Sequence, residues 1–121
     1  MDNILNASVE LINDKMKFKG IAGGNPEIIT DYIPPLGDGE GYTPLELFLV
    51  SLSTCLGGAM VVLIRKTRKS IESFSISAEG VRRETHPTCF EKITLNIRVK
   101  SPDATKQDIE KVLEMAEPIC P

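Results

Sequence analysis

The sequence has no tryptophan, one histidine and three cysteines, and only 5% of its residues are aromatic. Aliphatic side chains must therefore fill the core. The histidine, His86, has no candidate triad of serine and aspartate around it. Three cysteines without a signal-peptide pattern do not form the disulfide framework of a small secreted domain. Because the stretch MDNILNASVE has neither a basic nor an apolar region, we expect a cytoplasmic protein with reduced thiols.

Basic residues are also scarce. The 121 residues include 14 Lys and Arg against 17 Asp and Glu, which gives a formal net charge of −3. Residues 20–64 contain five acidic residues and no basic one, whereas four basic residues lie within 65–69. An acidic chain of this kind is not expected to bind nucleic acid or an anionic membrane surface. The glycines match no phosphate-binding loop, so no nucleotide is expected either.

Hydrophobic periodicity predicts a mixed α/β (α+β) fold. A period of two indicates strands in the first third of the chain and again in its second half, each set containing a hairpin. Apolar residues at helical spacing near the C-terminus indicate an amphipathic helix. The predicted strands are 5–11, 15–19, 27–33, 73–79 and 92–100, the turns are 13–14 and 85–87, and the helix is 105–116.

The long apolar run after Thr43 is the most informative stretch. Thr43 as N-cap, Pro44 in the first helical position and Glu46 three residues after the cap form a capping-box pattern. No charged residue occurs from 47 to 64, a length that raises the alternative of a membrane span. Small polar residues within the run and the sheet-like remainder of the chain favour a buried helix instead.

A helix that is apolar on all sides must be buried from solvent on all sides. Short strands and one small helix cannot supply it, so we expect a homodimer with these helices at its centre. Gly57 and Gly58 would permit a close approach of helices there, or a break in the helix after Cys55.

The three cysteines are candidates for different roles. Cys55 lies inside the predicted helix and is either a small buried hydrophobe or a thiolate activated by another element or subunit. Cys120, which follows the last helix, is either a resolving thiol or an unimportant tail residue. Cys89 has the same strand parity as Ile93 and is expected to face the core.

Two other residues have simpler interpretations. His86 and the three cysteines would supply the ligands of a Cys₃His zinc site, but Cys55 and Cys120 lack a paired C-x-x-C neighbour, so His86 is interpreted as an exposed turn residue. Glu46 is the acid of the capping box. Nine helical residues separate it from Cys55, which places the two on opposite faces of a straight helix.

Taken together, the pattern resembles the OsmC/Ohr family, the osmotically inducible protein C and organic hydroperoxide resistance superfamily. The resemblance is carried by the N-terminal hairpin, the glycine-rich loop, the TPLEL block at 43–47 ahead of Cys55, His86-Pro87, and the closing Cys120-Pro121. Asp31 before the loop makes the OsmC-like subgroup the nearer match. The family usually continues beyond the second Cys-Pro, so residues 1–121 are expected to be a single domain truncated at its C-terminus.

The resemblance implies an intertwined homodimer in which two long central helices are wrapped by sheets. It also implies a thiol-dependent peroxidase without metal, haem or flavin. Cys55 would match the peroxidatic cysteine that attacks an organic hydroperoxide, and Cys120 the resolving cysteine that forms a disulfide with it. An external dithiol would reduce that disulfide. Glu46 would support the site.

One difference between this chain and the family pattern leaves a second function as an alternative. The hydroperoxide enzymes have an N-terminal arginine that lowers the pKa of the peroxidatic cysteine, but this chain has no arginine before Arg65 and offers only Lys15, Lys17 and Lys19. The alternative is a dimeric redox-sensing or small-ligand-binding module without peroxidase turnover.

Overall fold

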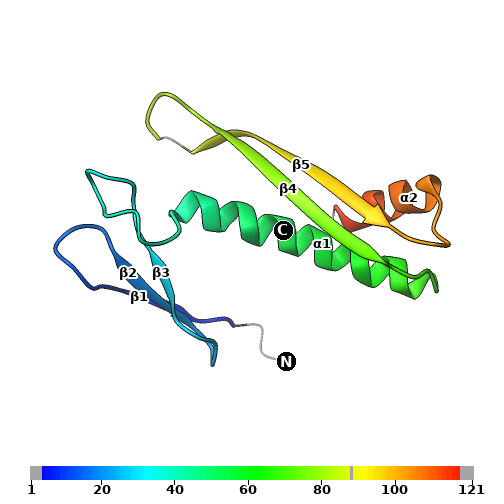
Figure 1. Cartoon of the computed structure of the whole chain (residues 1–121), viewed down its shortest axis with the longest axis horizontal. Coiled ribbons are helices and arrows are strands. Elements are labelled where there is room, and N and C mark those ends of the chain that lie inside the picture. Colours follow the sequence, from blue (N-terminus) through cyan, green and yellow to red (C-terminus); the bar gives the residue numbers. More distant parts are fainter. Residues whose placement is uncertain (1–3, 88, 118–121) are drawn as a thin grey trace. The chain divides into compact units, whose positions relative to one another are not determined.

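The computed structural model describes residues 4–87 and 89–117, and over these it shows the α+β fold predicted from the sequence (Figure 1). The elements are β1 (Ala7–Leu11), β2 (Phe18–Ala22), β3 (Ile28–Thr30), α1 (Pro44–Lys66), β4 (Ser73–Arg82), β5 (Phe90–Lys100) and α2 (Lys106–Ala116). Each predicted strand and helix is present, although β3 is shorter than expected because the chain enters the glycine-rich loop after Thr30.

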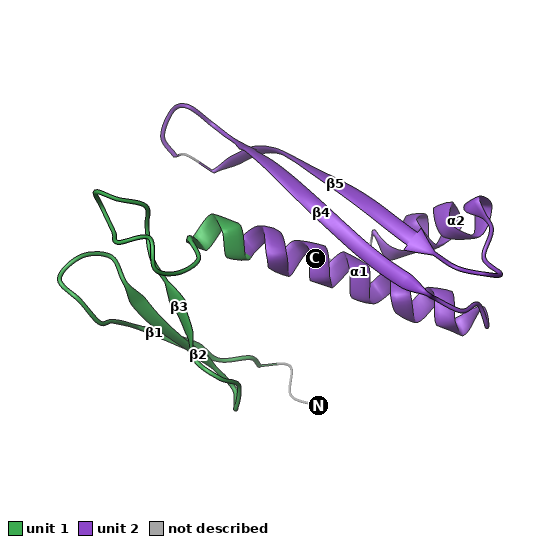
Figure 2. Cartoon of the chain, in the orientation of Figure 1, with its two compact units in different colours: residues 1–47 green, residues 48–121 purple. Residues whose placement is uncertain are grey.

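The chain divides into two compact units, residues 1–47 and residues 48–121 (Figure 2). Helix α1 begins in the first unit and continues through the second. It is unbroken at Gly57 and Gly58. A Cβ atom at Gly57 would lie 3.2 Å from side-chain atoms of both Phe74 and Ile76, so this glycine lets the helix approach β4 closely.

The first unit is an antiparallel sheet in the order β1-β2-β3. Its register pairs Val9 with Gly20 and Leu11 with Phe18, which places these residues on one apolar face. That face is open: Val9 is 67% exposed and Leu11 51%. Among the described residues of this unit no large hydrophobic side chain is buried, so the unit has no hydrophobic core of its own.

The second unit contains the core. Strands β4 and β5 form a long hairpin, and its inward side chains pack against α1 and α2. The buried cluster consists of Leu56, Met60 and Ile64 from α1 with Val112 and Ala116 from α2. The N-cap Thr105 and Asp108 fix the start of α2 by a reciprocal capping box.

The prediction that Cys89 faces the core was wrong, because Cys89 is exposed. A β-bulge is the physical reason. The register shifts between Val81 and Arg82, so that Val81 pairs with Lys92 but Arg82 pairs with Phe90. Phe90 therefore faces the core. The alternation of inward and outward side chains, counted back from Ile93, fails at the bulge and so gives the wrong side for Cys89.

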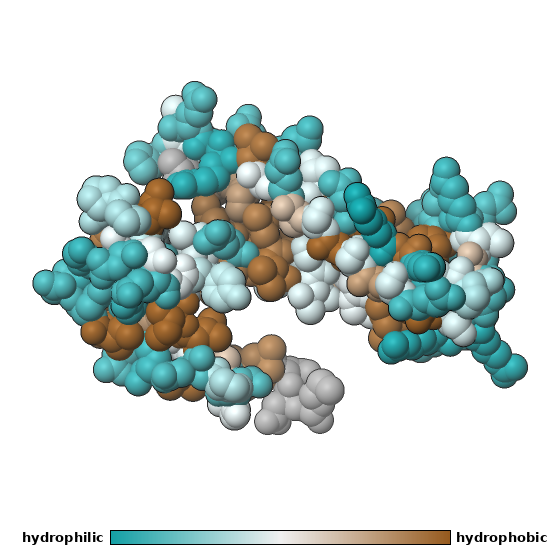
Figure 3. Space-filling model, viewed as in Figure 1, coloured by the Kyte–Doolittle hydropathy of each residue, from teal (hydrophilic) through white to brown (hydrophobic). Residues whose placement is uncertain are grey.

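Helix α1 is long and apolar enough to cross a membrane by length and composition. The core helix of a soluble protein satisfies the same criteria, and one side of α1 carries core residues of the second unit. Much of its remaining apolar surface is exposed, since Phe48 is 48% exposed and Val62 52%. Figure 3 shows that hydrophobic residues are exposed on the surface of the molecule.

Candidate functional site

Cys55 lies halfway along α1 and is half-buried within this chain. Ile64 is nine residues away, so at 100° per residue the thiol lies on the side of the helix opposite this core residue. Phe48 and Val62, each seven residues from Cys55, share its side. The thiol therefore lies on the same side of the helix as two apolar side chains that stay about half exposed, although the ring of Phe48 also contacts Phe90 with a centroid distance of 6.0 Å.

Glu46 fixes the start of the same helix. Its Oε1 accepts hydrogen bonds from the backbone N–H and the hydroxyl of Thr43, each at 2.9 Å, and the Glu46 N–H donates to Thr43 Oγ at 3.3 Å. These bonds, first the backbone one and then the hydroxyl one, hold the pKa of the exposed Glu46 side chain below its usual range and outweigh a smaller desolvation effect that would raise it. The predicted capping box is therefore formed.

The other predicted residues are not brought to Cys55 by the described structure. Cys89 and His86 lie exposed at the end of the β4–β5 hairpin, where Arg83 N–H donates to the Cys89 carbonyl at 2.9 Å. Cys120 lies outside the described residues, so its role as resolving cysteine stays a prediction.

Asp31 organises the loop that leads to α1. Its side chain is 0% exposed, and its carboxylate accepts backbone N–H bonds from Tyr32 at 2.8 Å, Asp38 at 3.3 Å and Glu40 at 3.2 Å. Burial alone would raise the pKa of Asp31, but these three hydrogen bonds outweigh it and hold the pKa below its ordinary value. A Cβ at Gly37 would lie 2.3 Å from Asp31 Oδ1, so the loop closes tightly around the carboxylate.

Sequence reasoning used Asp31 only as a family marker and missed this role. The signal was present, since an aspartate directly before a Pro- and Gly-rich loop is a residue type that accepts hydrogen bonds from turn N–H groups.

All three lysines of the N-terminal hairpin have carboxylate partners. Lys15 pairs with Asp38 at 2.7 Å, Lys17 pairs with Glu40, and Lys19 lies 4.0 Å from Glu10. Hydrogen bonds to Asp38 and Glu40 raise the pKa of Lys15 and Lys17, respectively. The candidate cations for a thiolate are thus already paired within their own unit.

Asp31, Asp38 and Glu40 form an acidic cluster whose ligand atoms lie within 4.8 Å of one another. The three backbone N–H bonds to Asp31 and the ammonium groups of Lys15 and Lys17 already neutralise it. The acidic cluster and its partners therefore hold the loop in one conformation.

The fold and the cysteine-bearing helix define the class: an α+β protein whose long apolar helix carries a thiol on its open side. The model of the family described as OsmC-like protein matches residues 37–121, and the chain belongs to this family. No curated protein is significantly similar to the chain in sequence.

Solved structures share the fold. The OsmC-like protein from Mycoplasma pneumoniae superposes with a TM-score of 0.84 at 18% identity, over 100% of this chain and 85% of that one. An OsmC-like protein of unknown function from Vibrio cholerae gives 0.84 at 20% identity, over 98% and 90%. A protein from Legionella pneumophila titled an organic hydroperoxide resistance protein gives 0.70 at 18% identity, over 98% and 85%. These similarities concern the fold.

Proposed function

We propose that this protein is a cytoplasmic, thiol-dependent peroxidase that reduces organic hydroperoxides. The observation that carries the proposal is the position of Cys55, a thiol on the open apolar side of α1 in a chain of the OsmC-like family. Structural relatives titled organic hydroperoxide resistance proteins support the choice of substrate class.

In the proposed reaction the Cys55 thiolate attacks the terminal oxygen of the hydroperoxide. The O–O bond breaks, the alkoxide takes up a proton and leaves as the alcohol, and the sulfur becomes a sulfenic acid. The Cys120 thiol then attacks this sulfur, water leaves, and a disulfide forms. An external dithiol returns both cysteines to thiols by exchange.

The active form is proposed to be an intertwined homodimer that makes residues 1–121 into one domain. Two open apolar surfaces support this: the face of β1 and β2 that carries Val9 and Leu11, and the side of α1 that carries Phe48 and Val62. A second copy can cover both surfaces, and covering the second one would also enclose Cys55 and exclude water from it.

A second candidate function is favoured by the paired lysines. Because Lys15, Lys17 and Lys19 already face carboxylates, the thiol lacks an evident free activating cation from this hairpin. A redox-sensing or small-ligand-binding dimer would need no such cation.

Dithiol-coupled consumption of a bulky organic hydroperoxide tests the proposal. We expect turnover by the wild type, a loss of at least about a hundredfold in Cys55→Ser, since the nucleophile is removed, and nearly full activity in Cys89→Ser, whose side chain is exposed at a hairpin end. Equal losses in both variants would point to a shared structural or zinc role of the cysteines, and no wild-type turnover together with an unreactive Cys55 would favour the second candidate.

A further inference from the structure

Basic side chains gather at the end of α1. Four of the five residues 65–69, which we call the basic segment, are Lys or Arg, whereas residues 20–64 contain neither. Arg65, Lys66 and Arg68 are exposed, and none of the three forms an ion pair in the part of the chain that the structure describes. Cations in the last turn of a helix complement its dipole, but Arg68 lies beyond that turn.

Arg68 occupies a position where glycine is the usual residue. Its N–H donates to the Arg65 carbonyl at 3.0 Å and the Lys69 N–H donates to the Ile64 carbonyl at 3.3 Å, which together form a Schellman ending of the helix. The backbone of Arg68 has a φ of 62°, in the left-handed region that is strained for a residue with a Cβ atom. A strained residue whose charge has no partner among the described residues points to a binding role for that charge.

The acidic groups next to the basic segment are already engaged. Asp103 accepts a hydrogen bond from the Ser70 N–H at 2.9 Å. This bond and, more weakly, the charge of Lys69 hold the pKa of Asp103 below its ordinary value. Glu72 faces Lys100 at 3.7 Å. The three exposed cations of the segment therefore keep their positive charge.

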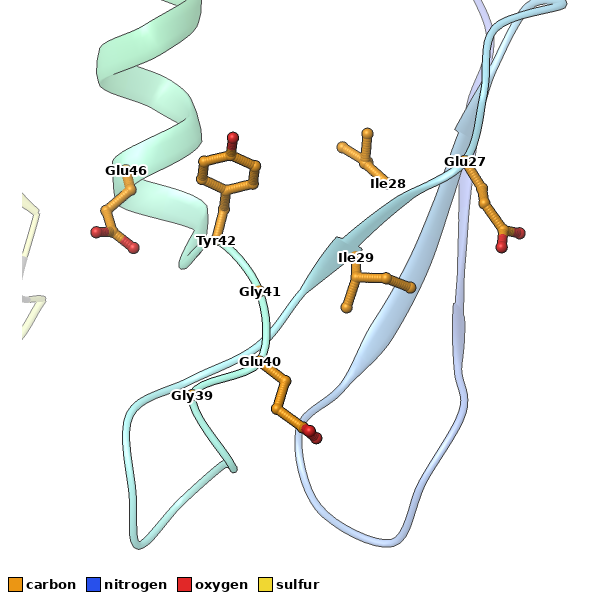
Figure 4. A pocket seen from close by; sticks show the side chains of 8 residues that line it. All are labelled: Glu27, Ile28, Ile29, Gly39, Glu40, Gly41, Tyr42 and Glu46. Atoms are coloured by element: carbon orange, nitrogen blue, oxygen red, sulfur yellow. The ribbon is translucent and has the colours of Figure 1, made fainter.

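The acidic start of α1 is too far away to neutralise them. Glu46, on the first turn, precedes Lys66 by twenty residues, roughly 30 Å at 1.5 Å per residue. Figure 4 shows Glu46 at the border of a cavity of about 640 Å³ that Glu27 and Glu40 also line. Because the Debye length is about 8 Å at physiological ionic strength, solvent ions screen Glu46 from Lys66.

We propose that the basic segment docks an acidic surface of the protein that carries the reducing dithiol. The inference rests on the proposed function, in which an external dithiol reduces the disulfide of Cys55 and Cys120. Lys66 follows Cys55 by eleven residues, which is about three helical turns, so it lies on the same side of α1 and roughly 16 Å along it. A protein bound at the segment is therefore within reach of the disulfide.

The exchange itself transfers two electrons and two protons. One thiolate of the partner attacks a sulfur of the disulfide, and the other sulfur leaves as a thiolate that takes up a proton. The partner's second thiolate then attacks the mixed disulfide, so the partner leaves as a disulfide and both cysteines are thiols again. Complementary charge mainly speeds the encounter, which suits a reductant that must leave after each exchange.

Reduction by dithiols of different charge tests the proposal. The protein is oxidised with one equivalent of organic hydroperoxide and then reduced by three peptides that share one C-x-x-C core flanked by glutamates, glutamines or lysines. Each rate is divided by that peptide's rate with a small uncharged disulfide, which removes differences in thiol reactivity. At low salt we expect the acidic peptide to be about tenfold faster than the basic one, and the difference to shrink at high salt. The net charge of −3 would by itself favour the basic peptide.

Arg68→Gly separates docking from stability. Glycine relieves the left-handed strain, so the urea midpoint should rise, whereas the rate with the acidic peptide should fall about two- to threefold. Adding Lys66→Gln should lower this rate further, to about a fifth of the wild-type rate. Lys92→Gln, at an exposed position on β5, is the matched control and should change nothing. Dithiothreitol, which is uncharged, should reduce all four proteins at the same rate.

The outcomes distinguish this inference from the proposed function. A disulfide of Cys55 and Cys120 that never forms would overturn the proposed function and the docking inference together. A disulfide that forms but is reduced by all three peptides at the same normalised rate would overturn the docking inference alone. The same holds if Arg68→Gly is more stable than wild type and reacts with the acidic peptide equally fast.

Discussion

Asp31 shows how one buried carboxylate determines a loop. It has no role in the proposed chemistry, yet three backbone N–H groups converge on it and the chain closes over it at Gly37. The loop it shapes leads directly into the Thr43–Glu46 cap of α1. We therefore assign Asp31 to the stability of this connection.

The pH dependence of this stabilisation follows from the sign of the pKa shift. Because the folded-state pKa of Asp31 lies below its ordinary value of 3.8, the stabilisation is complete well above that value. It is lost as the pH falls through the lowered folded-state value. Asp31→Asn should therefore lower the urea midpoint clearly at neutral pH, and the difference from wild type should shrink in acid below about pH 4.

Urea unfolding of both proteins across this pH range makes the comparison. Asp14→Asn, at an exposed position of the neighbouring turn, is the control and should have little effect. A deficit of Asp31→Asn that is the same in acid as at neutral pH would show that shape rather than charge matters at this position.

At the scale of elements, periodicity predicted the strands and helices well but failed at one irregularity. The alternation of Ile93, Leu95 and Ile97 with polar residues identified β5, because a half-buried strand has a period of two. The bulge that turns Cys89 outward depends on how Phe90 packs against the partner strand. No local sequence pattern predicts that packing, so the exposure of Cys89 could not be predicted from the sequence.

Gly80 is the residue that makes this packing possible. A Cβ built on it would lie 2.3 Å from Cε1 of Phe90, so the ring covers the glycine and no larger residue fits beneath it. Gly80→Ala should lower the free energy of unfolding by about 1–3 kcal/mol, the usual cost of overpacking. Gly24→Ala, where a Cβ would meet nothing within 4 Å, should stay within about 0.5 kcal/mol of wild type. Equal denaturant midpoints for the two variants would contradict this packing.

At the scale of the whole molecule, the sequence predicted from one uncharged run that a single chain cannot cover its own central helix. The structure extends this argument to the first unit, whose apolar sheet face is open and which lacks a buried hydrophobic side chain among its described residues. The sequence did not reveal which surfaces stay open, because that depends on the register of β1 with β2 and on which side of α1 meets β4.

A dimer is therefore expected to be the stable form. Sedimentation at micromolar concentration should give about twice the chain mass of 13.3 kDa, and the melting temperature should rise with protein concentration because folding and association are linked. Val62→Lys, on the open side of α1, should weaken association, whereas Lys111→Ala on the exposed side of α2 should not. A well-folded monomer whose melting temperature is independent of concentration would contradict the account.

The peroxidatic role of Cys55 is the central claim, and a stoichiometric oxidation followed by peptide mapping tests it most directly. One equivalent of organic hydroperoxide should be reduced to its alcohol while two thiols per chain disappear, with Cys55 joined to Cys120 within the chain and Cys89 still free. The Cys120→Ser variant should instead hold a sulfenic acid at Cys55. A Cys55–Cys89 bridge, a bridge between subunits, or three thiols that remain titratable would contradict the account.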